Sequence, residues 1–510
     1  MEFTQEIVLL ELLLIISVIA IVVRWIRLPY TIALVLAGLG IGVLHVVPQI
    51  ELTPHLILVV FLPALLFEAA FHLDWDLLRE NSRSIASLAV PGVLLSLVIV
   101  GAILAVGVGM PLEVAVVFGA LIAATDPVSV MATFRELGAP RRLSVLVEGE
   151  SLFNDGTALV LVGILSSVAL TGEFNVVESV LDFFRVVLGG MALGGVAGYL
   201  FSQFTRRLDD YLIEFTLTAV LAYGAFLLGE YLHISGVIAT VTAGILVGNY
   251  GTRVGMSPTT KITVTSFWEY GAFIANSFIF LLIGLQIDLP LLLQNVGPIV
   301  WAIVAVTVAR AVTVYLLSFL VNRFGRRIPL RWQHVLFWGG LKGALSLAAV
   351  LGLPLDFPHR QTLLVMAFGV VLWSLVVQGI TIQPLMVRLR LTQRSPERLE
   401  YERRRGQLMA TRAAWRELQA MQRDGILSPS VWRALNRDYR RRGRELSASV
   451  GELLSRQQGL EQEELVDVWR RCMQRERGTL QDLLRRGLIS EEAYRELATE
   501  VDRRLDRLAM

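Results

Sequence analysis

The sequence predicts an all-α polytopic membrane protein followed by a small soluble helical tail. Of its 510 residues 55% are hydrophobic, and the charged residues, 18% of the total, gather in the last part of the chain. Before that part the chain consists of apolar runs of roughly 20 residues, the length that a helix needs to cross a bilayer. We therefore expect a transmembrane domain over residues 1–390 and a cytoplasmic helical tail over residues 391–510.

About thirteen hydrophobic segments follow one another in the first domain. Their approximate limits are 6–23, 28–47, 55–72, 84–108, 112–134, 143–170, 180–204, 211–231, 234–249, 263–287, 293–321, 332–353 and 360–388. The residues before the first segment lack the basic start of a signal peptide, so we expect this segment to be retained as a span. The single cysteine, Cys472, excludes a disulfide within one chain.

Basic residues mark alternate loops between these segments. One set of loops holds Arg24 and Arg27, Arg79 and Arg83, Arg135, Arg141 and Arg142, Arg206 and Arg207, Arg253 and Lys261, and Arg323, Arg326, Arg327 and Arg331. The opposite set holds Arg360 and at most Arg185. Because cytoplasmic loops carry an excess of Lys and Arg, we expect the N-terminus outside and the tail in the cytoplasm.

The tail contains a short internal repeat. Leu418-Gln419, Arg423, Gly425, Ser428, Arg433 and Leu435 recur 62 positions later as Leu480-Gln481, Arg485, Gly487, Ser490, Arg495 and Leu497. In each copy the glycine is expected to end one helix and the serine to cap the next. This predicts two related helical hairpins, and a chance match within an Arg- and Glu-rich tail is the alternative.

Residues 147–155 place several carboxylates inside an apolar run of membrane-spanning length. Such residues are costly in a membrane and usually functional. Residues four apart share one face of a helix, so Ser151 lies with Asp155, and Glu150 lies with Asn154 on the adjacent face. We expect this polar stripe to face other polar groups, whereas Glu148 lies nearer the helix end and is expected to be peripheral.

Two of the hydrophobic segments are expected to be interrupted. Pro127 has no N–H group and clashes with the preceding turn, which should break the fifth segment and free the carbonyl of Ala123. The twelfth segment contains three glycines that weaken a helix, Gly339, Gly340 and Gly343. The two interruptions correspond if the first and last six segments are inverted halves, an arrangement that points to a transport site. Packing alone would explain the proline and the glycines but not Asp126 and Lys342.

Two further charged residues lie deep within predicted spans. Arg310 is always charged and too deep to reach the membrane surface easily, so it needs a buried carboxylate. We expect Glu150 to be this partner, in a structural ion pair. Glu68 is a lone carboxylate in the middle of the third segment and is a candidate functional residue.

Five short motifs resemble the sodium/proton exchanger family, of the bacterial NhaP and animal plasma-membrane exchanger type. They are Leu65-Leu-Phe-Glu-Ala-Ala, Ala124-Thr-Asp-Pro-Val, Glu150-Ser-Leu-Phe-Asn-Asp-Gly, Val308-Ala-Arg and Gly339-Gly-Leu-Lys-Gly-Ala. The resemblance implies a homodimer in the plasma membrane, with a dimerisation domain and a mobile core domain in each protomer. In the core two inverted bundles would bring the fifth and twelfth segments together as crossed broken helices.

The resemblance also implies the roles of the site residues. Oxygen atoms around one central carboxylate would bind Na⁺ or a proton, and they belong to Asp155, Asp126, Ser151, the backbone of Thr125, and Glu68. Supporting roles would fall to Asn154, Glu150, Arg310 and Lys342. The family commonly has arginine at the position of Lys342, so the charge is retained but the planar guanidinium is lost.

These observations predict an electroneutral Na⁺/H⁺ antiporter that works by alternating access. Na⁺ is a hard cation that prefers oxygen ligands, and a proton would compete with it for Asp155. K⁺/H⁺ antiport is the closest alternative. A cation channel would favour rings of carbonyls or charges in a symmetric pore, and an intramembrane aspartyl protease using Asp126 and Asp155 would leave Arg310 and Lys342 unexplained. The expected partners are monovalent cations, protons and lipid, without a cofactor, an enzymatic activity or a nucleic acid.

Overall fold

The computed structural model describes most of the chain. The described residues are 3–26, 29–44, 53–172, 175–206, 210–252, 256, 258–391, 396–456, and 468–508 except 470, 471, 474, 477, 481 and 485. Within them every regular element is helical, which confirms the predicted all-α class. Among the residues named above, Arg27, Arg207, Arg253, Gln481 and Arg485 lie outside the described part. The chain divides into two compact units, Met1–Thr392 and Gln393–Met510.

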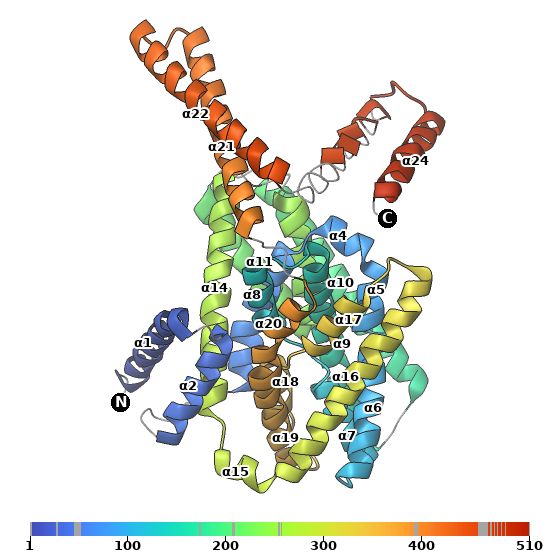
Figure 1. The fold of residues 1–510 in the computed structure, drawn as a ribbon. Coiled ribbons are helices and arrows are strands. Elements are labelled where there is room, and N and C mark those ends of the chain that lie inside the picture. The colour runs from blue at the N-terminus through green and yellow to red at the C-terminus, as the bar shows by residue number, and fades with distance from the viewer. Residues whose placement is uncertain are drawn as a thin grey trace. The chain divides into compact units, whose positions relative to one another are not determined.

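The first unit is a bundle of helices (Figure 1). Its elements, in which η denotes a π-helical segment, are α1 (Phe3–Ile26), α2 (Tyr30–Leu44), η1 (Leu56–Phe61), α3 (Leu62–His72), α4 (Trp75–Glu80), α5 (Ser82–Ala89), α6 (Pro91–Gly107), α7 (Leu112–Leu121), α8 (Val128–Leu137), α9 (Arg141–Thr171), α10 (Val176–Thr205), α11 (Tyr211–Tyr231), α12 (Gly236–Leu246), η2 (Val247–Gly251), α14 (Pro258–Leu285), α15 (Leu289–Gln294), α16 (Val296–Phe324), α17 (Leu330–Trp338), α18 (Ala344–Leu351), α19 (Arg360–Trp373), η3 (Ser374–Gln378) and α20 (Gly379–Arg388). Each hydrophobic segment of the sequence therefore contains one helix or a run of consecutive helices.

Several of these helices are long and apolar enough to cross a membrane. In the described residues there are 7 by length and composition: Ser82–Gly107, Arg141–Thr171, Val176–Thr205, Leu212–Tyr231, Thr260–Leu285, Val296–Arg323 and Arg360–Arg388. Shorter apolar helices occupy Leu10–Val23, Tyr30–Leu44, Leu56–His72, Leu112–Leu121 and Gly236–Gly251. The short ones include the pieces that result from interruption of a hydrophobic segment.

Small residues allow neighbouring helices of this unit to approach closely. Helix α2 packs along α14, where a Cβ added to Gly38 would lie 2.2 Å from the carbonyl oxygen of Leu281. Helix α10 packs along α12, where a Cβ added to Gly194 would lie 2.1 Å from the carbonyl oxygen of Ala239. Lipid is as apolar as a leucine side chain, so close van der Waals packing of this kind is a main source of attraction between helices in a membrane.

The helices of the first unit pack in two groups. One group joins α2, α3, α10, α11, α12 and α14, and the other joins α5, α6, α7, α9, α16, α17, α18 and α19. In the second group α6, α7 and α9 contact one another, and α16 contacts α17 and α19 in the same way. This grouping contains two similar sets of helices, each with one interrupted segment.

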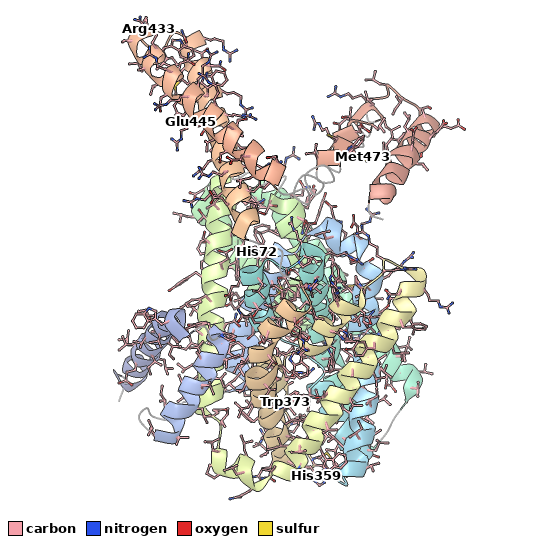
Figure 2. The ribbon with its side chains drawn as sticks, in the orientation of Figure 1. His72, His359, Trp373, Arg433, Glu445 and Met473 are labelled. Carbon is pink, nitrogen blue, oxygen red and sulfur yellow. The ribbon has the colours of Figure 1, made fainter. Side chains whose placement is uncertain are left out.

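Arginine-rich loops of the first unit meet at one end. The Arg142 guanidinium donates to the carbonyl oxygens of Arg327 at 3.0 Å and Arg326 at 3.3 Å, and Arg326 pairs with Glu80. Helix α4 lies at this end, and α15 lies at the opposite end (Figure 1). His72 and His359 likewise lie near opposite ends, with Trp373 between them (Figure 2). Three of the basic loops, at residues 79–83, 141–142 and 326–327, therefore share one side of this unit.

The fifth and twelfth segments are both broken, as predicted. Helix α7 ends at Leu121 and α8 begins at Val128, immediately after Pro127. Helix α17 ends at Trp338 and α18 begins at Ala344, after the glycine-rich stretch. Proline and glycine cause these two breaks by different means: the first removes a hydrogen-bond donor, and the second removes side chains that favour helical backbone angles.

The second unit contains α21 (Pro396–Arg423), α22 (Pro429–Arg456) and α24 (Glu491–Leu508). The turns after Arg423 and before Glu491 have the same geometry. Gly425 and Gly487 adopt left-handed backbone angles with φ of 72° and 67°, and each is followed by a residue whose N–H group bonds back to the ending helix. This is the hydrogen-bond pattern of a helix that ends at a glycine. Ser490 caps the next helix by accepting from the N–H group of Ala493 at 3.2 Å.

Candidate functional site

The two broken segments touch each other through their irregular stretches. The N–H group of Asp126 donates to the carbonyl oxygen of Leu341 at 2.8 Å. The ammonium group of Lys342 donates to the carbonyl oxygens of Ala123 at 3.1 Å and Ala124 at 3.2 Å. Residues that are more than 200 positions apart in the sequence therefore form one compact crossing, which confirms the predicted crossed broken helices.

Lys342 neutralises the end of a helix. Its side chain is only 4% exposed, and the two carbonyl oxygens that it binds belong to the stretch that follows the C-terminus of α7. The carbonyl end of a helix carries partial negative charge, which a cation stabilises. The carbonyl of Ala123 is the group that Pro127 leaves without a helical donor, so the lysine satisfies the acceptor that the proline frees.

Two glycines of the second break make room for charged side chains. A Cβ added to Gly343 would lie 2.3 Å from Oδ2 of Asp126, and a Cβ added to Gly340 would lie 2.5 Å from Nε of Arg310. Neither glycine has a positive φ. Their role is therefore close approach and not an unusual backbone conformation.

Helix α9 contributes two polar side chains to the first break. Asn154 Nδ2 donates to the carbonyl oxygen of Ala123 at 3.1 Å and lies 3.4 Å from the hydroxyl oxygen of Thr125. The Ser151 hydroxyl donates to the carbonyl oxygen of Thr125. Because Asn154 and Ser151 are 2% exposed, these bonds are shielded from water and fix the break against α9.

The two aspartates of the site line one cavity. Asp126 accepts a hydrogen bond from the N–H group of Val128 at 2.9 Å, which caps the start of α8. Asp155 lies one helical turn after Ser151 on α9, and among the described residues its buried Oδ1 has no hydrogen-bond partner. An acceptor oxygen of this kind, beside a second carboxylate, suits a hard cation or a proton.

The same cavity is lined by Thr125, Ser151 and Glu68, so the five residues predicted to bind the ion lie around one space. Glu68 is one turn before His72 on α3, and His72 Nδ1 lies 3.3 Å from its carboxylate. Glu148 also lines this cavity, although it was expected to be peripheral. The expectation failed because the helix continues to Arg141, and Glu148 therefore lies two turns inside α9.

Glu150 and Arg310 form a two-pronged ion pair. Arg310 Nη1 and Nη2 lie 2.5 Å and 2.9 Å from the two carboxylate oxygens, and Nη2 also donates to the carbonyl oxygen of Leu336 at 2.9 Å. The two side chains are 2% and 11% exposed. Removing one partner of a buried pair leaves an uncompensated charge and costs about 3–5 kcal/mol. The pair joins α9, α16 and α17.

A second, smaller cavity is lined by the supporting residues Asn154, Arg310 and Lys342. The ion-binding candidates and the supporting residues thus line separate spaces, with Glu150 held to Arg310.

Besides Glu148, two polar residues of the larger cavity were not among the predicted site residues. Ser346 is 1% exposed, and no partner of its hydroxyl is found in the described residues. Asn276 reaches the cavity from α14. The position of Ser346, one turn after Lys342 in an interrupted segment, is a signal that the sequence carries, whereas Asn276 is brought to the site only by the packing of α14.

Comparison with known proteins agrees with this arrangement. The family profile described as "Sodium/hydrogen exchanger, transmembrane" matches residues 12–388. The chain is 39% identical over 479 residues to the Na(+)/H(+) antiporter NhaG of Bacillus atrophaeus, covering 91% of this chain and 90% of that protein. It is 42% identical over 408 residues to the Na(+)/H(+) antiporter ApNhaP of Aphanothece halophytica, covering 79% of this chain and 77% of that protein.

A solved structure supports the fold. The sodium proton antiporter MjNhaP1 from Methanocaldococcus jannaschii matches with a TM-score of 0.64 and 21% identity, over 76% of this chain and 99% of that one. The family profile spans both broken segments and the helices that carry the aspartates. The chain is a multi-pass membrane protein that belongs to the sodium/hydrogen exchanger family.

Proposed function

We propose that the chain exchanges Na⁺ for H⁺ across the plasma membrane, and that both ions use Asp155. Asp126, Ser151, Glu68 and the backbone of Thr125 complete the site. The names of the relatives support the exchange of these two ions. The observation that carries the assignment to Asp155 is its buried, unpartnered carboxylate oxygen beside Asp126 in a cavity between the two broken helices.

The charges at the crossing support electroneutral exchange. At the crossing of the two breaks, Asp126, Asp155 and Glu150 are carboxylates and Arg310 and Lys342 are cations, which leaves one net negative charge before Glu68 and Glu148 of the cavity are counted. One bound Na⁺ and one bound proton each add the same single positive charge, so the two half-cycles carry equal charge. A bare charge is costly to carry through the low-dielectric region of a membrane. In this mechanism the helices that hold the site move only when Asp155 has bound one of the two ions.

Alternating access then requires that the cavity open to one side at a time. His72, one turn beyond Glu68, lies at the end of the first unit opposite His359 (Figure 2). Glu148 lies between Asp155 and the start of α9 at Arg141. These positions favour a cavity that opens toward the arginine-rich end. With that end in the cytoplasm, this conformation is the inward-facing state of the exchanger.

The experiment measures dissipation of a pH gradient in proteoliposomes that contain the purified protein. Addition of Na⁺, K⁺ or Li⁺ is compared for the wild-type chain, the Asp155→Asn variant and a chain that ends at Leu391. We expect Na⁺ to dissipate the gradient, the truncated chain to retain this activity because its site is complete, and Asp155→Asn to lose it. A rate that does not change when the membrane voltage is clamped at different values is the sign of electroneutral exchange.

Ser202→Ala provides a matched control, because the Ser202 hydroxyl is buried and, within the described residues, bonds only to the carbonyl of Gly198 in its own helix. Normal exchange by Asp155→Asn would disprove the proposed site. A larger response to K⁺ than to Na⁺ would make the protein a K⁺/H⁺ antiporter, and conductance without coupled proton movement would make it a channel.

We further propose that the first group of helices forms the dimerisation domain and that the second group forms the mobile core. The grouping itself and the resemblance to the exchanger family support this division. Measurement of the mass of the detergent-solubilised protein tests it, since a monomeric active protein would exclude the dimer.

A further inference from the structure

Ser374 is a buried serine that contacts the second break. It lies at the start of η3, between α19 and α20, and is 1% exposed. Its hydroxyl oxygen accepts a hydrogen bond from the backbone N–H group of Lys342 at 3.1 Å, and the hydroxyl donates to the carbonyl oxygen of Val371 at 2.9 Å. The hydroxyl group therefore connects the backbone of its own helical segment, at Val371, to the backbone of the irregular stretch, at Lys342.

The same arrangement occurs at the first break. There the Ser151 hydroxyl, from the helix that follows α7 and α8, binds the backbone of Thr125. At the second break Ser374, from the helical segment that follows α17 and α18, binds the backbone of Lys342. Four residues after each serine, on the same side of a helix, lie Asp155 and Gln378. Gln378 is buried and uncharged, so only the first half of the molecule places a carboxylate at this position.

The two serines serve opposite needs of the backbone. The first break leaves carbonyl groups free after α7, and Ser151 donates to one of them. At the second break Lys342 lies two residues before α18, in an irregular stretch where its N–H group has no helical acceptor, and Ser374 accepts from this group. A buried N–H group without an acceptor is destabilising. Ser374 thus fixes the backbone of the residue whose ammonium group holds Ala123 and Ala124.

The position of Ser374 in a π-helical segment fits this role. A π-helical turn inside an α-helix shifts the direction of the side chains and is frequent at functional sites. The segment covers Ser374–Gln378 and ends at Gly379, where an added Cβ would lie 2.8 Å from Cδ1 of Ile32 and 3.9 Å from Cδ1 of Leu341. The local widening of the helix therefore occurs where this segment faces the crossing.

We propose that Ser374 is a positioning residue for exchange, the counterpart of Ser151 in the second half, and that it acts by setting the place of the Lys342 ammonium group. The proposal rests on the exchange function proposed above. Ser374 does not touch the ion. Its loss should therefore affect the movement of the crossing more than the binding of Na⁺.

The experiment replaces Ser374 by alanine and measures Na⁺-dependent exchange in proteoliposomes over a range of Na⁺ concentrations, per amount of monodisperse protein. We expect Ser374→Ala to lower the maximal turnover about five- to tenfold, with an apparent KM for Na⁺ within about twofold of the wild type. Ser374→Thr keeps a hydroxyl and should restore at least half of the turnover. Ser202→Ala, which removes an equally buried hydroxyl away from the crossing, should exchange at the wild-type rate.

The outcomes are distinct. Wild-type turnover in Ser374→Ala would overturn the inference while leaving the exchange function intact. So would a Ser374→Thr variant no faster than Ser374→Ala, because the hydroxyl would then have no role. A loss that is confined to the yield of folded protein, with normal turnover per molecule, would show a merely structural serine. No exchange in the wild-type protein would instead disprove the proposed function.

Discussion

Gly343 lets the two broken helices approach each other beside the ion site. A Cβ added to Gly343 would lie 2.3 Å from Oδ2 of Asp126, which is shorter than any non-bonded contact between a carbon and an oxygen atom. Either the backbone or the carboxylate would therefore have to move. Asp126 cannot rotate away freely, since its other oxygen caps α8 through the N–H group of Val128. The absence of a side chain at Gly343 thus allows the Asp126 carboxylate to occupy its observed position.

We predict that Gly343→Ala lowers exchange at least about tenfold, because displacement of a binding group by about 1 Å can cost up to a hundredfold in rate. The measurement is the initial rate of Na⁺-dependent proton movement in proteoliposomes. Gly163→Ala is the matched control, since an added Cβ at Gly163 meets no atom within 4 Å. Equal rates for the two variants would mean that Asp126 does not need its observed position.

At the level of helices, the hydrogen bond between Thr31 and Ser129 joins α2 of the first group to α8, which contacts α9 of the second group. Thr31 belongs to α2, which packs along α14, and Ser129 lies in α8 just after the first break. Their hydroxyl oxygens are 2.5 Å apart, and both side chains are buried. If α8 moves with the core during exchange, this bond exists in one state of the cycle and is broken in the other.

We therefore predict that Thr31→Val shifts the population away from the described state. A net hydrogen bond contributes about 0.5–1.5 kcal/mol, which corresponds to a two- to tenfold weaker apparent affinity for Na⁺ on the side to which the cavity opens. Inside-out vesicles give this affinity from the Na⁺ dependence of exchange. Thr216→Val should leave the affinity for Na⁺ unchanged, because in the described part of the chain the Thr216 hydroxyl bonds only to the carbonyl of Leu212 in its own helix. An unchanged affinity in Thr31→Val would exclude a state-dependent bond.

The helices also show how far a sequence can predict such a site. Pro127 and the three glycines identify the two breaks because proline and glycine act locally on the backbone, and the freed carbonyl of Ala123 follows from the same rule. The pairing of Glu150 with Arg310 could be predicted because an arginine in a membrane requires a carboxylate. The two donors to that carbonyl, Asn154 and Lys342, lie 31 and 219 positions away in the sequence, beyond the reach of local rules. Ser374 could not be predicted either, because its direction depends on a π-helical segment that leaves no clear signal in the sequence.

For the whole molecule, the distribution of charge predicts which side faces the cytoplasm. Arg141 pairs with Asp74 at 3.1 Å, and Arg142 binds the carbonyl oxygens of Arg326 and Arg327, so loops distant in the sequence form one basic end. Basic loops are retained on the cytoplasmic side during insertion. We therefore predict that the loop before Arg360 faces outward and that the second unit, which follows α20, is cytoplasmic.

Cys472 allows this orientation to be tested without prior removal of other thiols, because it is the only cysteine of the chain and is exposed. A membrane-impermeant maleimide should label it only after permeabilisation of the cells or in inside-out vesicles. As a control, Leu355→Cys in a Cys472→Ser background should be labelled in intact cells, since Leu355 is 88% exposed in the loop between α18 and α19. Labelling of Cys472 in intact cells would reverse the orientation. The cavity that contains Asp155 would then open to the outside, and the described state would be the outward-facing one.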